Sequence, residues 1–207
     1  MDIIIKHFPQ LSAKQKQQYE EHARLFIEWN EKINCVSRKD IHNIWVNHIL
    51  HALTITKFIQ FKPFTHLLDV GTGGGLPGLP LAIYFPQVKF HLVDSIGKKI
   101  LVVNDLVDQL KLTNVLATNT RVEKLEGHYD FILSRAVAPA AEIIKWTYNK
   151  ISKDHHNDWK NGWIFWKGGN LDEELSTTGR KWKIIALQDE FQEPNFEEKF
   201  LVYSAKK

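Results

Sequence analysis

The chain has 207 residues, of which 43% are hydrophobic and 25% charged, and this length and composition fit one folded domain with a short appendage. The formal net charge of +3 permits a polyanionic partner but does not require one. Its single cysteine, Cys35, excludes an intrachain disulfide and a cysteine metal cluster, and we expect no metal site. No stretch approaches the roughly 20 apolar residues that span a bilayer, and residues 1–10 lack the apolar run of a signal peptide, so we expect no membrane partner.

Residues 1–62 predict a helical cap. Ser12 and Gln15 resemble a capping box, and apolar residues follow at helical spacing as far as Ile33. A second apolar stripe at helical spacing runs from Ile41 to Ile59. We expect these helices to pack on a main domain formed by residues 63–207.

From residue 63 onward, strand-like and helix-like runs alternate. We predict helices at 77–85, 98–110 and 139–150, a polar loop at 152–162, and strands at 65–70, 88–94, 115–119, 129–134, 163–166, 182–188 and 199–204. This alternation predicts parallel βαβ units. The last two strands have no helix between them, so we expect an antiparallel hairpin at the sheet edge. The predicted fold class is therefore α/β, a Rossmann-like sheet of the class I methyltransferase type.

A glycine-rich segment at 68–78 follows the first predicted strand, where open α/β sheets bind ligands. Gly71, Gly73 and Gly75 can adopt positive φ and let a ligand approach the backbone. A P-loop does not fit, because no Gly-Lys-Ser/Thr follows. A dinucleotide site stays open, since Gly73, Gly75 and Gly78 fit the G-x-G-x-x-G pattern. A purely structural turn is the remaining alternative.

Nearby residues favour S-adenosylmethionine over a dinucleotide. Pro77 and Pro80 in the first helical turn weaken a pyrophosphate site, because proline lacks an N–H. S-adenosylmethionine carries no phosphate, and its positive charges favour the carboxylate of Asp69, acting directly or through the loop or water. Asp94 ends the second strand and can accept both ribose hydroxyls of either nucleotide. Glu123, after the third strand, can read an adenine edge or be an ordinary solvated residue.

These motifs, in this order and spacing, resemble the ribosomal RNA small-subunit methyltransferase G family, also called glucose-inhibited division protein B. The resemblance runs from about residue 25 to the C-terminus and is carried by segments 29–34, 47–50, 69–82, 92–99, 121–123 and 134–139. It implies a cytoplasmic, S-adenosylmethionine-dependent enzyme that methylates N7 of guanine 527 in 16S rRNA. It also implies cofactor contacts at Gly71, Leu76, Val122, Glu123 and Arg135.

The chain departs from the family in the helical cap. The family often has Arg where this chain has Asn47, Asp where it has His51, and Asn-Leu-Thr where residues 34–37 read Asn-Cys-Val-Ser. These departures bear on the acceptor side of the site and leave the cofactor motifs intact.

Methylation of guanine N7 needs no general base, because N7 carries an exposed lone pair and loses no proton. We therefore expect the enzyme to act by positioning. The candidates are Arg135, which can touch cofactor, phosphate or base, His48, a base contact or a helix-packing residue, and Lys167, a phosphate contact or an ordinary lysine at a strand end.

The expected partner is 16S rRNA, free or within the small ribosomal subunit, and the expected state is a monomer. Three other functions stay open from the residues themselves: a methyltransferase with a different acceptor, an NAD-dependent oxidoreductase, and a non-catalytic RNA-binding protein.

Overall fold

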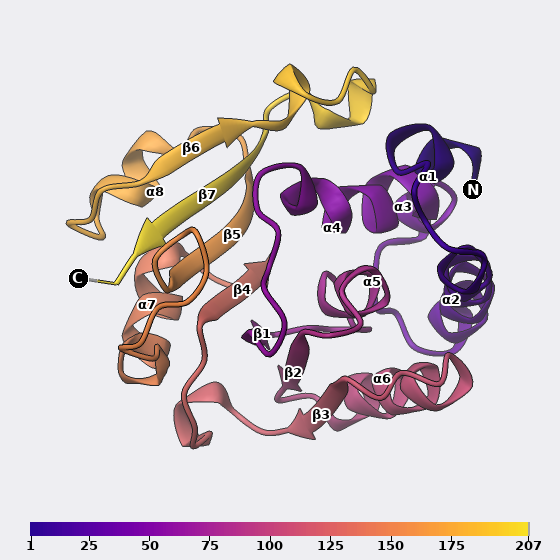
Figure 1. The fold of residues 1–207 in the computed structure, drawn as a ribbon, viewed down its shortest axis with the longest axis horizontal. Coiled ribbons are helices and arrows are strands. Elements are labelled where there is room, and N and C mark those ends of the chain that lie inside the picture. Colours follow the sequence, from indigo (N-terminus) through magenta and orange to yellow (C-terminus); the bar gives the residue numbers. More distant parts are fainter. Residues whose placement is uncertain (207) are drawn as a thin grey trace.

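A seven-stranded sheet in the order β3-β2-β1-β4-β5-β7-β6 divides the computed structural model into two sides (Figure 1). The structure describes residues 1–206, apart from the side chain of Arg38. Strands β1 to β5 pair in parallel, whereas β7 pairs antiparallel with both β5 and β6. The strands are β1 (His66–Val70), β2 (Lys89–Asp94), β3 (Val115–Asn119), β4 (Phe131–Arg135), β5 (Gly162–Gly168), β6 (Lys183–Ala186) and β7 (Lys199–Ala205).

This topology confirms the predicted α/β class and the antiparallel pairing of the last two strands. One feature was not predicted: β7 lies between β5 and β6, so that β6 forms the edge. The predicted strand at 182–188 is shorter in the structure, since β6 ends at Ala186 and a 3-10 turn, η5 (Leu187–Asp189), follows.

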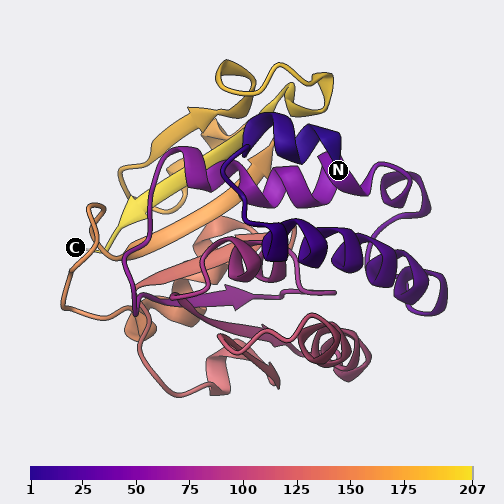
Figure 2. The same ribbon diagram turned by 45° about the vertical axis from the view of Figure 1, so that its right-hand side comes forward.

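Helices cover both faces of the sheet (Figure 2). One face packs against α1 (Asp2–His7), α2 (Ala13–Lys32), α5 (Gly78–Tyr84) and α6 (Gly97–Gln109), and the other against α7 (Ala140–Thr147) and α8 (Asp172–Ser176). Three short 3-10 turns follow β3, α7 and η5 along the chain: η3 (Val122–Lys124), η4 (Tyr148–Lys150) and η6 (Pro194–Phe196). The helices predicted at 77–85, 98–110 and 139–150 are present, whereas α1 and α8 were not predicted.

Side chains alternate between the two faces, as the period of a strand requires. In β5, Ile164 and Trp166 enter the hydrophobic cluster on the side of the N-terminal helices, while Trp163 and Phe165 enter the cluster on the side of α7. Phe26 of α2 belongs to the first of these clusters. The N-terminal helices and the sheet therefore share one continuous apolar core.

The second apolar stripe, predicted as one helical run from Ile41 to Ile59, changes its winding along the way. It divides into α3 (Arg38–Ile41), a π-helical turn η1 (Trp45–Leu50), α4 (His51–Leu53) and a 3-10 turn η2 (Thr54–Lys57). Single π turns occur frequently at functional sites. Here the turn carries His48, and His51 follows three residues later on the same side of the helix.

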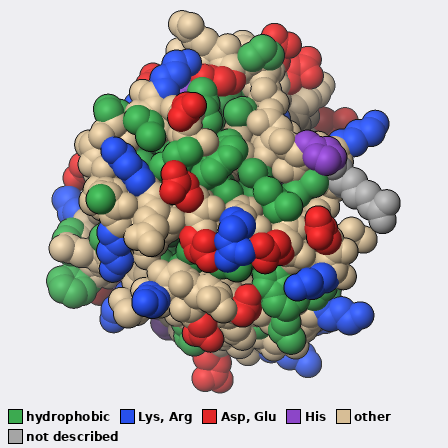
Figure 3. Space-filling view, turned by 90° about the vertical axis from the view of Figure 1, so that its right-hand side faces the viewer, with side chains coloured by type: hydrophobic (Ala, Val, Ile, Leu, Met, Phe, Trp, Pro, Cys, Tyr) green, Lys and Arg blue, Asp and Glu red, His purple; other side chains and the backbone are tan. Residues whose placement is uncertain are grey.

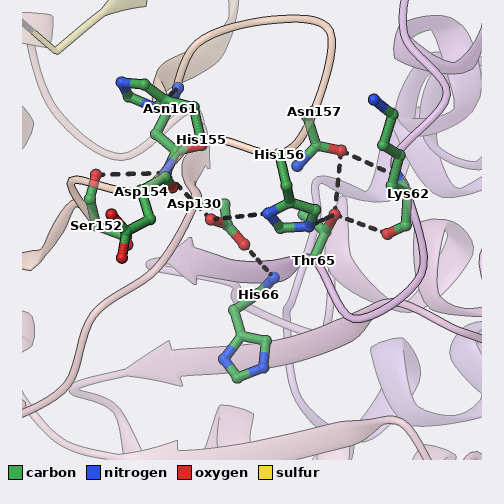
Figure 4. Close-up of polar contacts among 10 residues, drawn as sticks. All are labelled: Lys62, Thr65, His66, Asp130, Ser152, Asp154, His155, His156, Asn157 and Asn161. Carbon is green, nitrogen blue, oxygen red and sulfur yellow. Dashed lines mark hydrogen bonds and ion pairs between the residues drawn. The ribbon is translucent and has the colours of Figure 1, made fainter.

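The polar segment predicted as a loop at 152–162 is held against the amino ends of β1 and β4 (Figure 4). The carboxylate of Asp130 accepts hydrogen bonds from the His66 N–H at 2.8 Å and from the Asn161 amide at 3.1 Å. The Asn161 amide also donates to the carbonyl of Asp154 at 2.7 Å, and Thr65 Oγ1 lies 3.2 Å from His156 Nε2. These contacts lie at the amino ends of the strands, whereas the glycine loop follows the carboxyl end of β1. They therefore stabilise the sheet but do not line the site.

Candidate functional site

The glycine loop between β1 and α5 forms the centre of the site. Gly71, Gly73 and Gly75 have φ angles of +66°, +59° and +97°, which confirms the left-handed backbone expected for them. A Cβ atom at Gly71 would lie 2.5 Å from Val137 Cγ2, whereas nothing lies within 4 Å of a Cβ at Gly73. Gly71 is thus packed against the segment that follows β4, and Gly73 borders open space.

The buried carboxylate of Asp69, on β1, stabilises this loop through hydrogen bonds. Its Oδ2 accepts hydrogen bonds from the Thr72 hydroxyl at 2.7 Å and from the Gly78 N–H at 3.0 Å. Burial raises the pKa of Asp69 to about 7, although the two hydrogen bonds act in the opposite direction. The Gly78 N–H begins helix α5, where a dinucleotide would place its pyrophosphate. Because Asp69 already occupies that N–H, the geometry disfavours the dinucleotide interpretation.

Asp94 fixes the loop from the end of β2. Its Oδ2 accepts from the Gly73 N–H and its Oδ1 from the Ile96 N–H, both at 2.9 Å. Each carboxylate oxygen keeps a further lone pair for a ligand hydroxyl. A cavity of about 320 Å³ opens beside it and is lined, among others, by Gly71, Asp94, Ile96, Val122, Glu123, Val137 and Trp146.

This first cavity, here called the donor cavity, fits a nucleoside such as S-adenosylmethionine. It offers a carboxylate at the sugar side, the side chains of Ile96 and Val122 as apolar walls, and a loop backbone without side chains. It brings together four predicted contacts: Gly71, Asp94, Val122 and Glu123. Asp69 and Gly75 are not among the residues that line it, and Gly73, Leu76 and Arg135 line the neighbouring cavity instead.

The neighbouring cavity, here called the acceptor cavity, has a volume of about 500 Å³. It shares Gly71, Lys99 and Ala136 with the donor cavity, so the two spaces meet at the glycine loop. Its other walls come from the helical cap, the loop and two strand ends: Cys35, Val36, Ser37, Asp40, Asn47, His48, His51, Thr72, Gly73, Gly74, Leu76, Arg135 and Lys199.

Arg135, at the end of β4, organises the acceptor cavity. Its guanidinium donates to the Asn47 carbonyl at 3.3 Å and lies 3.2 Å from His48 Nδ1 and 3.5 Å from His51 Nδ1. Burial lowers the pKa of Arg135 to about 10, so it stays charged at neutral pH. Burial and this charge together lower the pKa of His48 to about 3. The same two causes also lower the pKa of His51 well below its ordinary value. Both imidazoles are therefore neutral and accept at Nδ1, which places their N–H at Nε2.

Lys167 points to protein groups. Its Nζ lies 2.6 Å from Glu174 Oε1 and donates to the Ala138 carbonyl at 3.0 Å. The sequence predicts Lys167 and His48 as candidates and marks His51 as an acceptor-side departure from the family, but it does not predict Lys99 or Lys199 as site residues. Lys99 stands in the Gly-Lys-Lys segment after Asp94, which was a usable signal, whereas only packing brings Lys199 of β7 to the cavity. Within residues 1–206, no group of three or more His, Cys, Asp or Glu is arranged to hold a metal ion.

Solved structures share this fold. A SAM-dependent methyltransferase from Aquifex aeolicus superposes with a TM-score of 0.54 at 17% sequence identity, covering 75% of this chain and 89% of that one. Fibrillarin from Aeropyrum pernix, solved with bound S-adenosyl-L-methionine, superposes with a TM-score of 0.55 at 13% identity, covering 75% and 74%. The chain thus has the Rossmann-like fold of the class I S-adenosylmethionine-dependent methyltransferases.

The sequence places the chain more narrowly within that class. The family model described as rRNA small subunit methyltransferase G matches residues 15–199. The ribosomal RNA small subunit methyltransferase G of Bacteroides thetaiotaomicron is 47% identical over 204 residues, which covers 99% of each chain. The chain therefore belongs to the rRNA small subunit methyltransferase G family, and it is an enzyme that uses S-adenosylmethionine to modify ribosomal RNA.

Gly73 lines the acceptor cavity, but its N–H is bonded to Asp94 of the donor cavity, and it lies two residues from Gly71, which lines both. Replacing Gly73 by leucine should therefore fill the open space beside the loop and weaken donor binding by about 2.8 kcal/mol, roughly a hundredfold in Kd. Gly179→Leu is the matched control, because Gly179 has a φ of +60° and open surroundings but lines neither cavity. Calorimetric titration with S-adenosylmethionine checks both variants. Equal affinities for Gly73→Leu and Gly179→Leu would show that the donor does not use this space.

Lowering the pH should destabilise the protein through His48. An unfolded histidine takes up a proton near pH 6.5, whereas the folded-state pKa of His48 is about 3. The contribution of His48 to stability is therefore complete above pH 6.5 and is lost as the pH falls toward 3. Between pH 7.5 and pH 5 we expect a loss on the order of 2 kcal/mol from this residue.

Urea unfolding at the two pH values measures this loss. His48→Gln should lose correspondingly less stability than the wild type over the same interval, and His128→Gln, at an exposed histidine, should behave like the wild type. A His48→Gln variant with the full wild-type pH dependence would contradict the assigned protonation state.

Proposed function

We propose that this enzyme transfers the methyl group of S-adenosylmethionine to N7 of a guanine in 16S rRNA, at the position of guanine 527. The donor, when bound, supplies an electrophilic methyl group on a positive sulfur. The residues of the chain have to hold the acceptor base against that group and in line with it. The observation that carries the proposal is the position of Arg135, which lines the acceptor cavity between two neutral histidines and directly precedes Ala136, a residue that lines both cavities.

The charges of the acceptor cavity suit a polyanion. Lys99, Arg135 and Lys199 line it, and Asp40 is the acidic residue among its walls. The outer face of the helical layer, by contrast, shows acidic and basic side chains side by side (Figure 3), as where Arg24 pairs with Glu21 and Glu28. Cations concentrated at the site therefore support binding of the RNA backbone there.

Arg135 keeps hydrogen-bonding capacity for a ligand. A guanidinium has five N–H donors, and the contacts to Asn47, His48 and His51 use three of them. The remaining two donors can reach a phosphate oxygen or the O6 atom of a guanine. The protein contacts hold the planar group in one orientation, so less side-chain entropy is lost when the substrate binds.

The acceptor cavity supports a reaction that removes no proton. His48 and His51 have lowered pKa values and turn their basic Nδ1 atoms toward Arg135, so they are poor proton acceptors. Guanine N7 attacks with a free lone pair and requires no base. Amino or hydroxyl acceptors lose a proton during methylation and are less suited to these surroundings.

The proposal also assigns a role to each part of the chain. Residues 1–62 act as the acceptor-side cap over a methyltransferase domain formed by residues 63–207, and the reaction takes place in the cytoplasm with the chain as a monomer. No helix within residues 1–206 is long and apolar enough to cross a membrane.

Incubation with labelled S-adenosylmethionine and small ribosomal subunits that lack the modification should place the label on N7 of that one guanine. Arg135→Met should lower kcat/KM by roughly a hundredfold, about 2.7 kcal/mol of transition-state stabilisation. Arg24→Met, at an exposed ion pair on α2, should stay near wild type. Label mapped to another atom, another nucleotide or a ribosomal protein would overturn the proposal.

A further inference from the structure

Ala136 and Val137, the first two residues of the short segment Ala136 to Pro139, form part of the wall of the donor cavity. Ala136 lines both cavities, and Val137 lines the donor cavity while packing against Gly71. Ala136 has a φ of +57°, a conformation that alanine adopts at a cost of roughly 1–2 kcal/mol. Val137 is 41% exposed, so burial of its own side chain does little to hold the segment in place. A wall of this kind persists only if neighbouring groups hold it.

An ion pair supplies those groups. A single carboxylate oxygen, Glu174 Oε1, lies 2.6 Å from Lys167 Nζ and accepts the Ala140 N–H at 2.7 Å. Lys167 Nζ in turn donates to the Ala138 carbonyl at 3.0 Å. The two backbone bonds bracket Pro139, which has no N–H of its own. The ion pair is thus hydrogen-bonded to the backbone on both sides of Pro139.

The ion pair is itself held by the fold. Lys167 lies on β5, the strand next to β4, and Glu174 lies on α8, whose Leu175 is packed in the same hydrophobic cluster as Ala140. The side chains of Lys167 and Glu174 are 13% and 28% exposed, so water and salt screen them less than a surface pair. Because Ala140 begins α7, the same contact also positions Trp146, which lines the donor cavity.

We propose that Glu174 is a positioning residue for methyl transfer. It acts through Lys167 and the Ala140 N–H to hold residues 138–140, and thereby keeps Ala136 and Val137 in place in the wall of the donor cavity. The inference rests on the methyl-transfer part of the proposed function and is independent of which RNA base is the acceptor. It gives Lys167 a role on the donor side, different from a contact to RNA phosphate.

Calorimetric titration of the full-length protein with S-adenosylmethionine, without RNA, tests this role. Glu174→Ala and Lys167→Met should each raise the donor Kd by about tenfold, because Ala136 and Val137 would no longer be held in their positions in the donor cavity. The double variant should bind S-adenosylmethionine with about the same affinity as the single variant that binds it less tightly, because both residues act on one segment. Glu173→Ala is the matched control: it removes the same charge from the same helix but leaves the three contacts intact.

Steady-state kinetics with small ribosomal subunits separates positioning from a general loss of structure. Glu174→Ala should raise the donor KM and lower kcat, while the acceptor KM stays within about twofold of wild type. Glu174→Gln retains an acceptor for the Ala140 N–H and should recover part of the donor affinity. If Glu174→Ala does not fold, Glu174→Gln and Lys167→Met decide the matter.

Donor affinity within twofold of wild type in folded Lys167→Met and Glu174→Gln would overturn the proposal, as would an equal loss in Glu173→Ala. Donor binding needs no RNA, so these results stand apart from the identity of the methylated base. Strong donor binding with methylation of a different target would count against the proposed function and leave the role of Glu174 intact.

Discussion

Two buried carboxylates at the ends of neighbouring parallel strands determine the shape of the glycine loop. Asp69 of β1 and Asp94 of β2 accept hydrogen bonds from the backbone N–H groups of Gly78, Gly73 and Ile96 and from the Thr72 hydroxyl. A buried carboxylate requires such partners, because leaving it unpaired is costly. To supply them, the loop bends through positive φ angles, and that bend leaves the open space beside Gly73.

The two cavities follow from this arrangement and from one cation. The charge of Arg135 and the charge of Asp69 each favour the ionised form of the other, although burial opposes both. The hydrogen-bond partners of Arg135 on the acceptor side are a carbonyl and two neutral imidazoles. The cavity has one acidic wall residue, Asp40, against the three cations Lys99, Arg135 and Lys199, so positive charge is in excess there. In the proposed function, the donor side presents the Asp94 carboxylate to the ribose, and the acceptor side presents cations to the RNA.

Local sequence patterns predicted the parts of this structure that local physics determines. The alternation of strands and helices, the glycine loop and the placement of Asp94 at a strand end all depend on neighbours along the chain, and the structure contains them. The predicted Ser12 capping box is present for the same reason. The resemblance of the motifs to a known family supplied the reaction, which the residues alone left open.

Tertiary contacts determine the parts that were missed. The insertion of β7 between β5 and β6 carries Lys199 to the acceptor cavity, and no local pattern near Lys199 encodes that position. The π-helical turn at Trp45–Leu50 interrupts a stripe that reads as an ordinary helix, because its apolar spacing stays compatible with one. The sequence shows Lys167 as a cation at a strand end, but the pairing of Lys167 with Glu174 depends on how α8 packs.

The central claim is that the two carboxylates shape the loop before the donor arrives. Amide hydrogen exchange at Gly73 and Gly78 in the donor-free protein tests it most directly. Both N–H groups are bonded to carboxylates in the folded chain, so both should exchange slowly without donor, and adding S-adenosylmethionine should change their rates little. Rapid exchange at both amides in the free protein, with protection only after the donor binds, would show that the donor builds the loop and would contradict the account.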